Sequence, residues 1–222
     1  MKLRHRIKYL VRFLWCYPFD KREAGYWQYL LLNANEKHLL DHPLTTESVV
    51  FDVGGFTGNF SADIVKRYDC NVYIFEPVSA HYQSLVERFK GNSKVRAFNF
   101  GLSNKSSTAT ISVNGSGSSV HIEGEASEKI QLVDVCKFIA RENIQRIDLM
   151  AVNIEGSEYE LLPRILDSGL LEKVETIQIQ FHLYDEPRYV RARAEIVKRI
   201  LESHRIKFSF PFTWECFSKT PR

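Results

Sequence analysis

The sequence predicts an α/β fold with a mostly parallel central sheet, helices on both of its faces and an antiparallel strand near the carboxyl terminus. From position 49 onward, short apolar runs alternate with segments of helical periodicity, which is typical of βαβ units. The 222 residues are 44% hydrophobic, which is enough apolar material for one large core. We therefore expect an N-terminal helical segment at 1–45 and one α/β domain at 46–222.

The first half of the expected domain alternates strands and helices. The expected elements are a strand at 49–53, a helix at 58–67, a strand at 71–75, a helix at 79–90, a strand at 95–100 and a short antiparallel strand at 108–113. Residues 114–128 are rich in Gly, Ser and Glu, so we expect a long loop there.

The second half continues the same alternation. The expected elements are a helix at 132–141, a strand at 147–153, a helix at 158–167, a strand at 174–181, a helix at 188–203 and two strands at 206–210 and 212–218. Ser157 and Glu160 fit a capping box at the start of the helix at 158–167.

Basic residues concentrate at the amino terminus. Residues 1–22 hold seven Lys or Arg and one acidic residue, which leaves 23 basic and 26 acidic residues elsewhere. A nucleic-acid enzyme more often carries a basic surface across its body. We therefore expect no nucleic-acid partner.

The first 19 residues have the pattern of a basic amphipathic helix. Four bases precede an apolar stretch that Arg12 interrupts, and no apolar run reaches the ~20 residues of a membrane span. Two interpretations stay open: peripheral membrane contact through residues 1–19, or an accessory helix packed on the domain. The four cysteines are far apart and lack metal-site spacing, so a reducing cytoplasm is the expected location. The sequence does not indicate the oligomeric state.

A glycine-rich turn follows the first strand of the domain. The strand carries Asp52 near its end, and Gly54, Gly55 and Gly58 follow before a helix. Ligands of open α/β sheets bind at the carboxyl ends of the strands, and glycine lets the backbone approach them closely. The turn therefore predicts a nucleotide-type pocket.

The spacing favours S-adenosylmethionine as the nucleotide. A dinucleotide fingerprint starting at Gly54 needs glycine where Phe56 and Asn59 stand, and no P-loop motif occurs. Asp52 would repel a pyrophosphate but can accept hydrogen bonds, directly or through water, from a cationic amino-acid group. Glu76 ends the next strand, where an acid can bind ribose hydroxyls.

Several segments resemble motifs of the FkbM-type S-adenosylmethionine-dependent methyltransferases, which mostly methylate hydroxyl groups of natural products and glycans. The matching segments are FDVGGFTGNFS (51–61), IFEP (74–77), GLSN (101–104) and IDLMAVNIEG (147–156). The resemblance implies a Rossmann-like methyltransferase fold with S-adenosylmethionine as cofactor. The cofactor-binding residues expected from the turn and the resemblance together are Asp52, Gly54, Gly55, Gly58, Glu76, Leu102 and Ser103.

The expected catalytic residues follow the central strands. Methyl transfer to a hydroxyl requires alignment of the acceptor and removal of its proton, and Asn153, Glu155 and His182 stand where a base could act. Period-two alternation puts Gln178, Gln180 and His182 on one side, as a polar wall of the site. A histidine with the ordinary pKa of ~6.5 would serve as general base, and Glu155 is the rival base or an orienter of the acceptor.

The predicted function is O-methyl transfer to a small-molecule or glycan hydroxyl, above all on a sugar. Asn153, Glu155 and His182 could also converge on a metal, but the sequence does not establish that convergence and we predict no metal site. Two alternatives stay open. One is a catalytically silent binding module, because Ala151 and Asn153 replace the family's usual lysine and aspartate. The weaker alternative is an NAD-dependent oxidoreductase.

Overall fold

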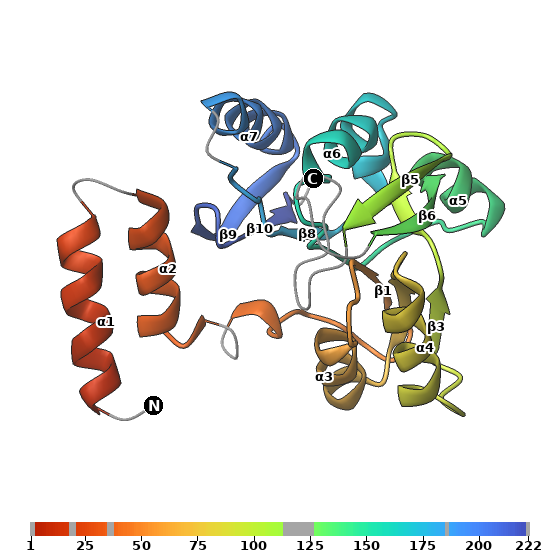
Figure 1. Ribbon diagram of the computed structural model, residues 1–222, viewed down its shortest axis with the longest axis horizontal. Coiled ribbons are helices and arrows are strands. Elements are labelled where there is room, and N and C mark those ends of the chain that lie inside the picture. Colours follow the sequence, from red (N-terminus) through yellow and green to blue (C-terminus); the bar gives the residue numbers. More distant parts are fainter. Residues whose placement is uncertain (1–2, 18–20, 35–37, 113–126, 185–186, 221–222) are drawn as a thin grey trace.

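The protein is built around a seven-stranded sheet, seen in a computed structural model that describes residues 3–17, 21–34, 38–112, 127–184 and 187–220 (Figure 1). Its strands, in spatial order, are β3 (Val95–Phe98), β2 (Asn71–Phe75), β1 (Val49–Val53), β7 (Leu149–Val152), β8 (Thr176–Ile179), β10 (Trp214–Lys219) and β9 (His204–Phe210). The strands from β3 to β8 are parallel, whereas β10 runs antiparallel to both β8 and β9. The predicted α/β fold, with its antiparallel carboxyl-terminal strand, is confirmed.

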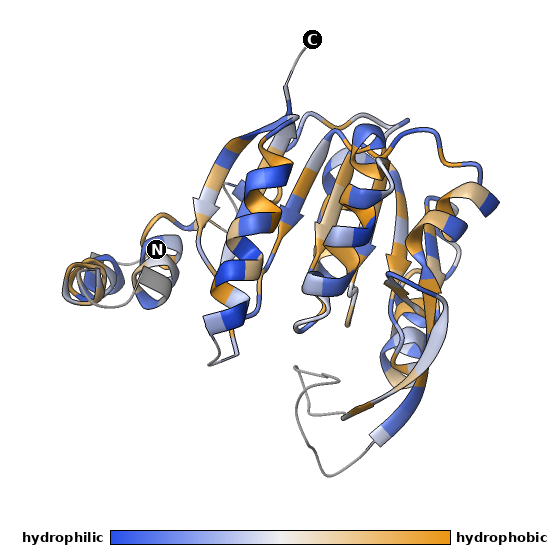
Figure 2. Cartoon of the chain, turned by 90° about the horizontal axis from the view of Figure 1, so that it is seen from above, coloured by the Kyte–Doolittle hydropathy of each residue, from blue (hydrophilic) through white to orange (hydrophobic). Residues whose placement is uncertain are grey.

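Helices cover both faces of this sheet (Figure 1). The helices are α1 (Leu3–Cys16), α2 (Lys21–Leu31), α3 (Asn59–Tyr68), α4 (Ser79–Arg88), α5 (Val135–Arg141), α6 (Glu158–Asp167), the 3-10 helix η2 (Leu170–Lys173) and α7 (Pro187–Ile200). Alternation along β1 turns Phe51 and Val53 toward the core shared with α5, α6 and α7, and Val50 toward the core under α3 and α4. Figure 2 shows largely hydrophobic strands between helices that are hydrophilic on their outer sides.

A second, three-stranded sheet corrects one sequence-based expectation. Its strands are β4 (Gly101–Ser103), β6 (Ser127–Asp134) and β5 (Ser107–Ser112), in that order, and β5 is antiparallel to β6 as expected. The helix expected at 132–141 begins only at Val135, because β6 extends to Asp134. The side chain of Asp134 then caps α5 by accepting hydrogen bonds from the amides of Cys136 (2.8 Å) and Lys137 (3.1 Å). Most of the loop expected at 114–128 lies outside the described residues.

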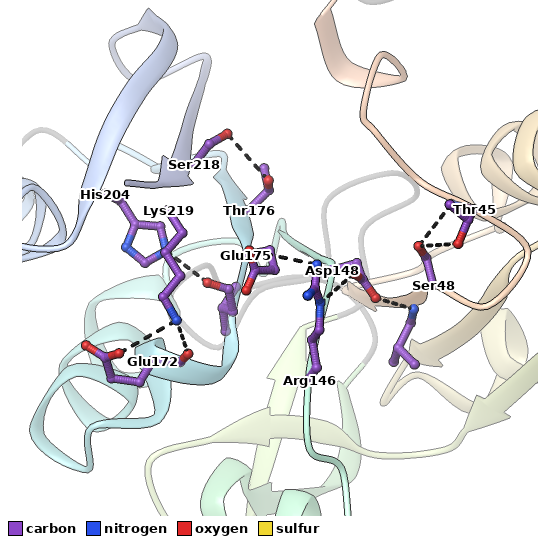
Figure 3. A network of polar contacts seen from close by, with 12 residues as sticks. Thr45, Ser48, Arg146, Asp148, Glu172, Glu175, Thr176, His204, Ser218 and Lys219 are labelled. Carbon is purple, nitrogen blue, oxygen red and sulfur yellow. Dashed lines mark hydrogen bonds and ion pairs between the residues drawn. The ribbon is translucent and has the colours of Figure 1, made fainter. Parts of the chain in front are cut away.

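Polar contacts close the amino ends of the central strands (Figure 3). One oxygen of Asp148 accepts a hydrogen bond from the Val49 amide at 2.9 Å, and the other accepts one from Arg146 Nε at 2.8 Å. Further along the sheet, Nε2 of the buried His204 lies 3.0 Å from the Val174 carbonyl oxygen. These contacts tie neighbouring strands together at their amino ends, whereas ligands of open α/β sheets bind at the opposite, carboxyl ends.

The two N-terminal helices form a hairpin beside β9 (Figure 1). Cys16 Sγ donates a hydrogen bond to Glu23 at 3.0 Å, which joins α1 to α2. A Cβ on Gly25 would lie 3.1 Å from the Pro211 carbonyl oxygen, so α2 approaches the β9–β10 turn closely. Among the described residues, no helix is long and apolar enough to cross a membrane.

The aromatic core beneath the sheet generates a stability prediction. The ring of Phe138 is fully buried and lies within 6.0 Å of the ring centroids of Phe51, Phe75, Phe98 and Phe100. We expect Phe138→Ala to lower the free energy of unfolding by about 3–5 kcal/mol, since it leaves a cavity in close-packed surroundings. Urea denaturation measures this loss.

The matched control for that measurement is Val86→Ala on the outer side of α4. The Val86 side chain is 45% exposed, so its truncation is expected to change the free energy of unfolding by no more than about 0.5 kcal/mol. Equal losses in the two variants would contradict the assignment of Phe138 to the core.

Candidate active site

A cavity of about 400 Å³ lies at the carboxyl ends of β1, β2 and β7. Five of the residues predicted from the sequence line it: Gly54, Glu76, Leu102, Asn153 and Glu155. The second sheet closes one side of the cavity with apolar side chains from β5 and β6. The remaining predicted residues stand behind this lining, and their contacts show what each can do there.

The three glycines of the first turn are required by close internal contacts. A Cβ on Gly54 (φ 92°) would lie 1.9 Å from the Asn153 carbonyl oxygen, so two strand ends meet at this point. A Cβ on Gly55 would lie 2.1 Å from the Ile74 side chain, and one on Gly58 (φ 75°) 2.6 Å from Leu85. The glycines therefore let β1, β2, α4 and the loop after β7 pack together, and Gly54 is the one of the three that also lines the cavity.

Asp52 lies behind the turn and does not line the cavity. Ser61 Oγ donates a hydrogen bond to its carboxylate at 2.5 Å. Burial raises the pKa of Asp52 to about 6, against the opposing effect of the Ser61 hydrogen bond and with a further rise from the charge of Glu76. The sequence analysis missed Ser61, whose signal is a hydroxyl in the first turn of the helix that follows the glycines.

Glu76 holds the glycine turn in place from the end of β2. Its two carboxylate oxygens accept hydrogen bonds from the Phe56 amide at 2.8 Å and the Val78 amide at 2.9 Å, and His81 Nδ1 lies 3.7 Å away. Burial raises the pKa of Glu76, although these amides and His81 oppose the rise. Each oxygen keeps acceptor capacity toward the cavity. The carboxylate can therefore bind a ligand hydroxyl while it holds the Phe56 and Val78 amides.

Phe56 and His81 are cavity residues that the sequence analysis did not single out. Phe56 has a left-handed backbone (φ 47°), and its ring meets that of His81 edge to face at 4.5 Å. A non-glycine residue in this conformation costs about 1–3 kcal/mol and persists where its surroundings fix it. The hydrogen bond from its amide to Glu76 supplies that constraint.

A second acid organises the loop after β7. Glu158 is fully buried, and its carboxylate accepts hydrogen bonds from the amides of Ile154 and Gly156, both at 3.0 Å. It also accepts one from His182 Nδ1 at 2.9 Å. The capping box expected from Ser157 and Glu160 is wrong, because Ser157 makes no side-chain cap. The buried Glu158 binds amides of the loop that precedes the helix instead.

His182 lies between two carboxylates. Its Nε2 is 3.3 Å from Glu155 Oε2, on the side opposite Glu158. Burial lowers the pKa of His182, but the hydrogen bonds and charges of Glu155 and Glu158 outweigh that effect and raise the pKa to about 10. The imidazole is therefore protonated at neutral pH. The raised pKa differs from the ordinary value of ~6.5 that the sequence analysis assumed for a histidine acting as base.

The expected polar wall of Gln178, Gln180 and His182 is also wrong. Gln178 is fully buried, and its Oε1 lies 3.1 Å from Nε2 of His42, in the segment that precedes β1. His182 instead turns toward α6 and the loop after β7. The alternation ends because β8 stops at Ile179, so the side of the strand no longer determines where His182 points.

Asn153 and Glu155 present polar atoms at the cavity. Asn153 Oδ1 is buried and has no hydrogen-bond partner among the described residues, so a donor group of a ligand would satisfy it. Glu155 has a left-handed backbone (φ 50°), and Tyr184 donates a hydrogen bond to its carbonyl oxygen at 2.6 Å. Its side chain is 30% exposed and lines the cavity.

These groups fit S-adenosylmethionine. Glu76 can accept from ribose hydroxyls, Asn153 Oδ1 can accept from an ammonium group, and the apolar side chains of Phe75 and Leu102 can pack on adenine. Ser103 is buried in β4 beside this wall without lining it. In the part of the chain that the structure describes, no group of three or more His, Cys, Asp and Glu side chains is placed to hold a metal ion.

Comparison with known proteins agrees with this geometry. Residues 52–212 match the family described as the methyltransferase FkbM domain. No curated protein matches the chain in sequence. The family match spans the loops after β1 and β7, the second sheet and strand β9.

Solved structures share the fold at low sequence identity. A Streptococcus mutans protein assigned as a methyltransferase, solved in complex with SAH, aligns with a TM-score of 0.52 and 12% identity over 85% of this chain and 97% of its own. A Clostridium thermocellum protein assigned as an rRNA methylase aligns with a TM-score of 0.54 and 10% identity, over 86% and 96%. These likenesses confirm the predicted Rossmann-like methyltransferase fold.

The contacts of His182 generate a titration prediction. We expect the ring to titrate near 10 in an NMR pH series, well above the ordinary histidine value of ~6.5. Glu155→Gln should lower that midpoint, because it removes one of the two charges that favour the protonated ring. A midpoint near 6.5 in the wild-type protein would contradict the arrangement.

The same shift has a thermodynamic signature. A histidine whose pKa is raised on folding stabilises the native state fully below the unfolded pKa of ~6.5, and this contribution disappears as the pH rises to about 10. The difference in unfolding free energy between the wild type and His182→Asn should therefore shrink over that interval. Urea denaturation at several pH values checks this.

Proposed function

The chain belongs to the FkbM methyltransferase family, and from this premise we propose that it transfers the methyl group of S-adenosylmethionine to a hydroxyl oxygen of a sugar or glycan. Family membership confirms the predicted methyltransferase class and its cofactor. The acceptor and the oxygen as the methylated atom are the parts that we propose. The observation that carries them is the Glu155 carboxylate at the cavity, held by a protonated His182.

The proposed chemistry needs a proton acceptor next to the acceptor hydroxyl. S-adenosylmethionine supplies an electrophilic methyl carbon on a sulfonium. The hydroxyl oxygen forms a bond to that carbon as the carbon–sulfur bond breaks, and its proton passes to Glu155. Because His182 already holds a proton, we assign the role of base to Glu155 and that of positioning residue to His182.

The remaining residues of the site support this division of roles. Glu158 fixes His182 and the amides on both sides of Glu155, which restrains the backbone of the base, and His182 Nε2 contacts its carboxylate. Tyr159 OH donates to the His182 carbonyl oxygen at 2.8 Å, which fixes the backbone of the histidine as well. A carboxylate held in this way is oriented before the acceptor arrives.

The departures from the family motif do not favour a silent binding module. Ala151 is buried in β7, where Asp52 and Gln178 are its neighbours across the sheet, and it does not line the cavity. A lysine there would stand beside Asp52 in the sheet. Asn153 does line the cavity, with a free acceptor oxygen. Neither replacement removes the carboxylate of Glu155, the proposed base.

The cavity lining supports a sugar as the acceptor. Lys105, Ser157 and Glu160 stand on its wall with Glu155, and together they offer donors and acceptors to a polyhydroxylated molecule. Several of the structural neighbours are described as RNA methylases, and that substrate is a property of those proteins. The slight excess of acidic residues outside the first 22 positions argues against a nucleic-acid acceptor here.

We extend the proposal to the organisation and location of the chain. The N-terminal segment at 1–45 would be an attachment to the methyltransferase domain at 46–222, in keeping with the position of the α1–α2 hairpin beside the sheet (Figure 1). The four cysteines, all within the described residues, form no disulfide bonds with one another, which is in keeping with the reducing cytoplasm.

Glu76 generates a prediction on cofactor affinity. We expect Glu76→Ala to weaken S-adenosylmethionine binding by about 1.5–3 kcal/mol, since hydrogen bonds to a charged group are lost. Calorimetry measures the change, with the exposed Glu47→Gln as the matched control. NAD should not bind either protein. Unchanged affinity in Glu76→Ala would contradict the ribose contact.

Glu155 generates a prediction on turnover. With labelled S-adenosylmethionine and a panel of sugars, we expect Glu155→Gln to lower kcat by about 10²–10⁴-fold with little change in cofactor affinity. Glu47→Gln, which alters an exposed carboxylate outside the cavity lining, is the control and should retain full activity. Wild-type turnover should show no inflection near pH 6.5, because His182 stays protonated there.

Three outcomes of that assay contradict the proposal. Full activity in Glu155→Gln would remove the glutamate as base. An inflection near 6.5 that disappears in His182→Asn would return that role to the histidine. Label transferred to RNA and to none of the sugars would overturn the acceptor class.

A further inference from the structure

Helix α1 has one side packed and one side open. Its packed side faces α2: the ring of Tyr9 lies 5.9 Å from that of Trp27, the guanidinium of Arg12 lies over the same indole, and Cys16 is buried at the hydrogen bond to Glu23. These positions lie three or four residues apart, so they share one face of the helix. The opposite face has no neighbour among the described residues of the body (Figure 1).

That open face is a continuous apolar stripe. Ile7, Leu10, Val11 and Leu14 follow the spacing i, i+3, i+4 and i+7, and they are 55%, 44%, 59% and 61% exposed. Trp15 lies beside the stripe and is 75% exposed. Most exposed large apolar residues in a soluble fold occur singly, whereas a stripe of this kind marks a surface that is covered in use.

The charges beside the stripe indicate what covers it. Arg4 and Lys8 lie along one flank and Arg6 along the other, all three exposed, and α1 contains no acidic residue. An apolar face flanked by bases is the pattern of helices that lie in the headgroup region of an anionic membrane. A second copy of the chain would bring two such basic helices together, and their like charges would repel each other.

We propose that α1 docks the protein on an anionic lipid surface, with the stripe Ile7, Leu10, Val11 and Leu14 inserted among the acyl chains and the flanking bases paired with lipid phosphates. The sequence analysis left two interpretations of the N-terminus open. The packing of α1 on α2 fits an accessory helix, and the open stripe fits membrane contact in addition. The inference concerns a surface away from the cavity and does not rest on the acceptor or on the base.

Vesicle co-sedimentation of the full chain tests the proposal. The wild type should bind vesicles of phosphatidylcholine mixed with phosphatidylserine and bind vesicles of phosphatidylcholine alone far more weakly. Leu10→Gln with Leu14→Gln should weaken binding by about a hundredfold, because two apolar side chains that insert into the lipid are lost. Arg4→Gln with Lys8→Gln should weaken it by about thirtyfold and reduce its dependence on salt.

Matched controls distinguish insertion of α1 from non-specific adsorption of the protein to vesicles. Val86→Gln with Val190→Gln removes two exposed apolar side chains elsewhere, and Lys66→Gln with Lys198→Gln removes two exposed bases elsewhere. Both pairs should bind vesicles as the wild type does. Insertion should also shift the tryptophan emission to the blue, and Trp15→Phe should abolish most of that shift. S-adenosylmethionine affinity, which should stay unchanged in every variant, verifies that each one folds.

Three results would overturn the proposal. Equal binding to both kinds of vesicle would remove the role of the bases. Unchanged binding in Leu10→Gln with Leu14→Gln would remove the stripe. If light scattering shows that the wild type is a dimer and this variant a monomer, and neither binds vesicles, the stripe is an interface between copies.

Discussion

The buried carboxylate of Glu158 is the constraint on which the site depends. A charged group without access to water is stable only if the protein supplies donors for it. Glu158 finds three: the amides of Ile154 and Gly156 and the ring of His182. The two amides fix the backbone on either side of Glu155, and the ring must be protonated to serve both carboxylates. The charge state of the cavity is thus set by a residue that does not reach it.

The two loops that border the cavity are built in the same way. In the loop after β1, Glu76 accepts the amide of Phe56, and in the loop after β7, Glu158 accepts the amides around Glu155. Phe56 and Glu155 are both non-glycine residues with a left-handed backbone. The loops also touch each other, because Gly54 allows the Asn153 carbonyl to approach. Strain in each loop is therefore held by an acid, and the cavity is shaped before any ligand enters.

The sequence predicts the site motifs well but not the contacts between residues that are far apart in the chain. Periodicity and the glycines locate Gly54 and Glu76 at the cavity, since local patterns encode strand ends. The sequence does not reveal the side-chain contact between Gln178 and His42, because these positions are 136 residues apart. Glu158 stays hidden for another reason: the local pattern also fits a capping box, and only burial distinguishes the two. The start of α5 is misplaced because β6 and the helix share a boundary at Asp134.

The position of α2 affects how the large sheet ends. β9 is the last strand of the sheet, and an uncovered last strand exposes backbone donors and acceptors that can pair with another chain. Tyr29 of α2 packs edge to face on Phe210 of β9 at 5.6 Å, and Gly25 brings the helix against the turn that follows. The hairpin thus shields this border of the sheet and opposes its growth into intermolecular β-structure.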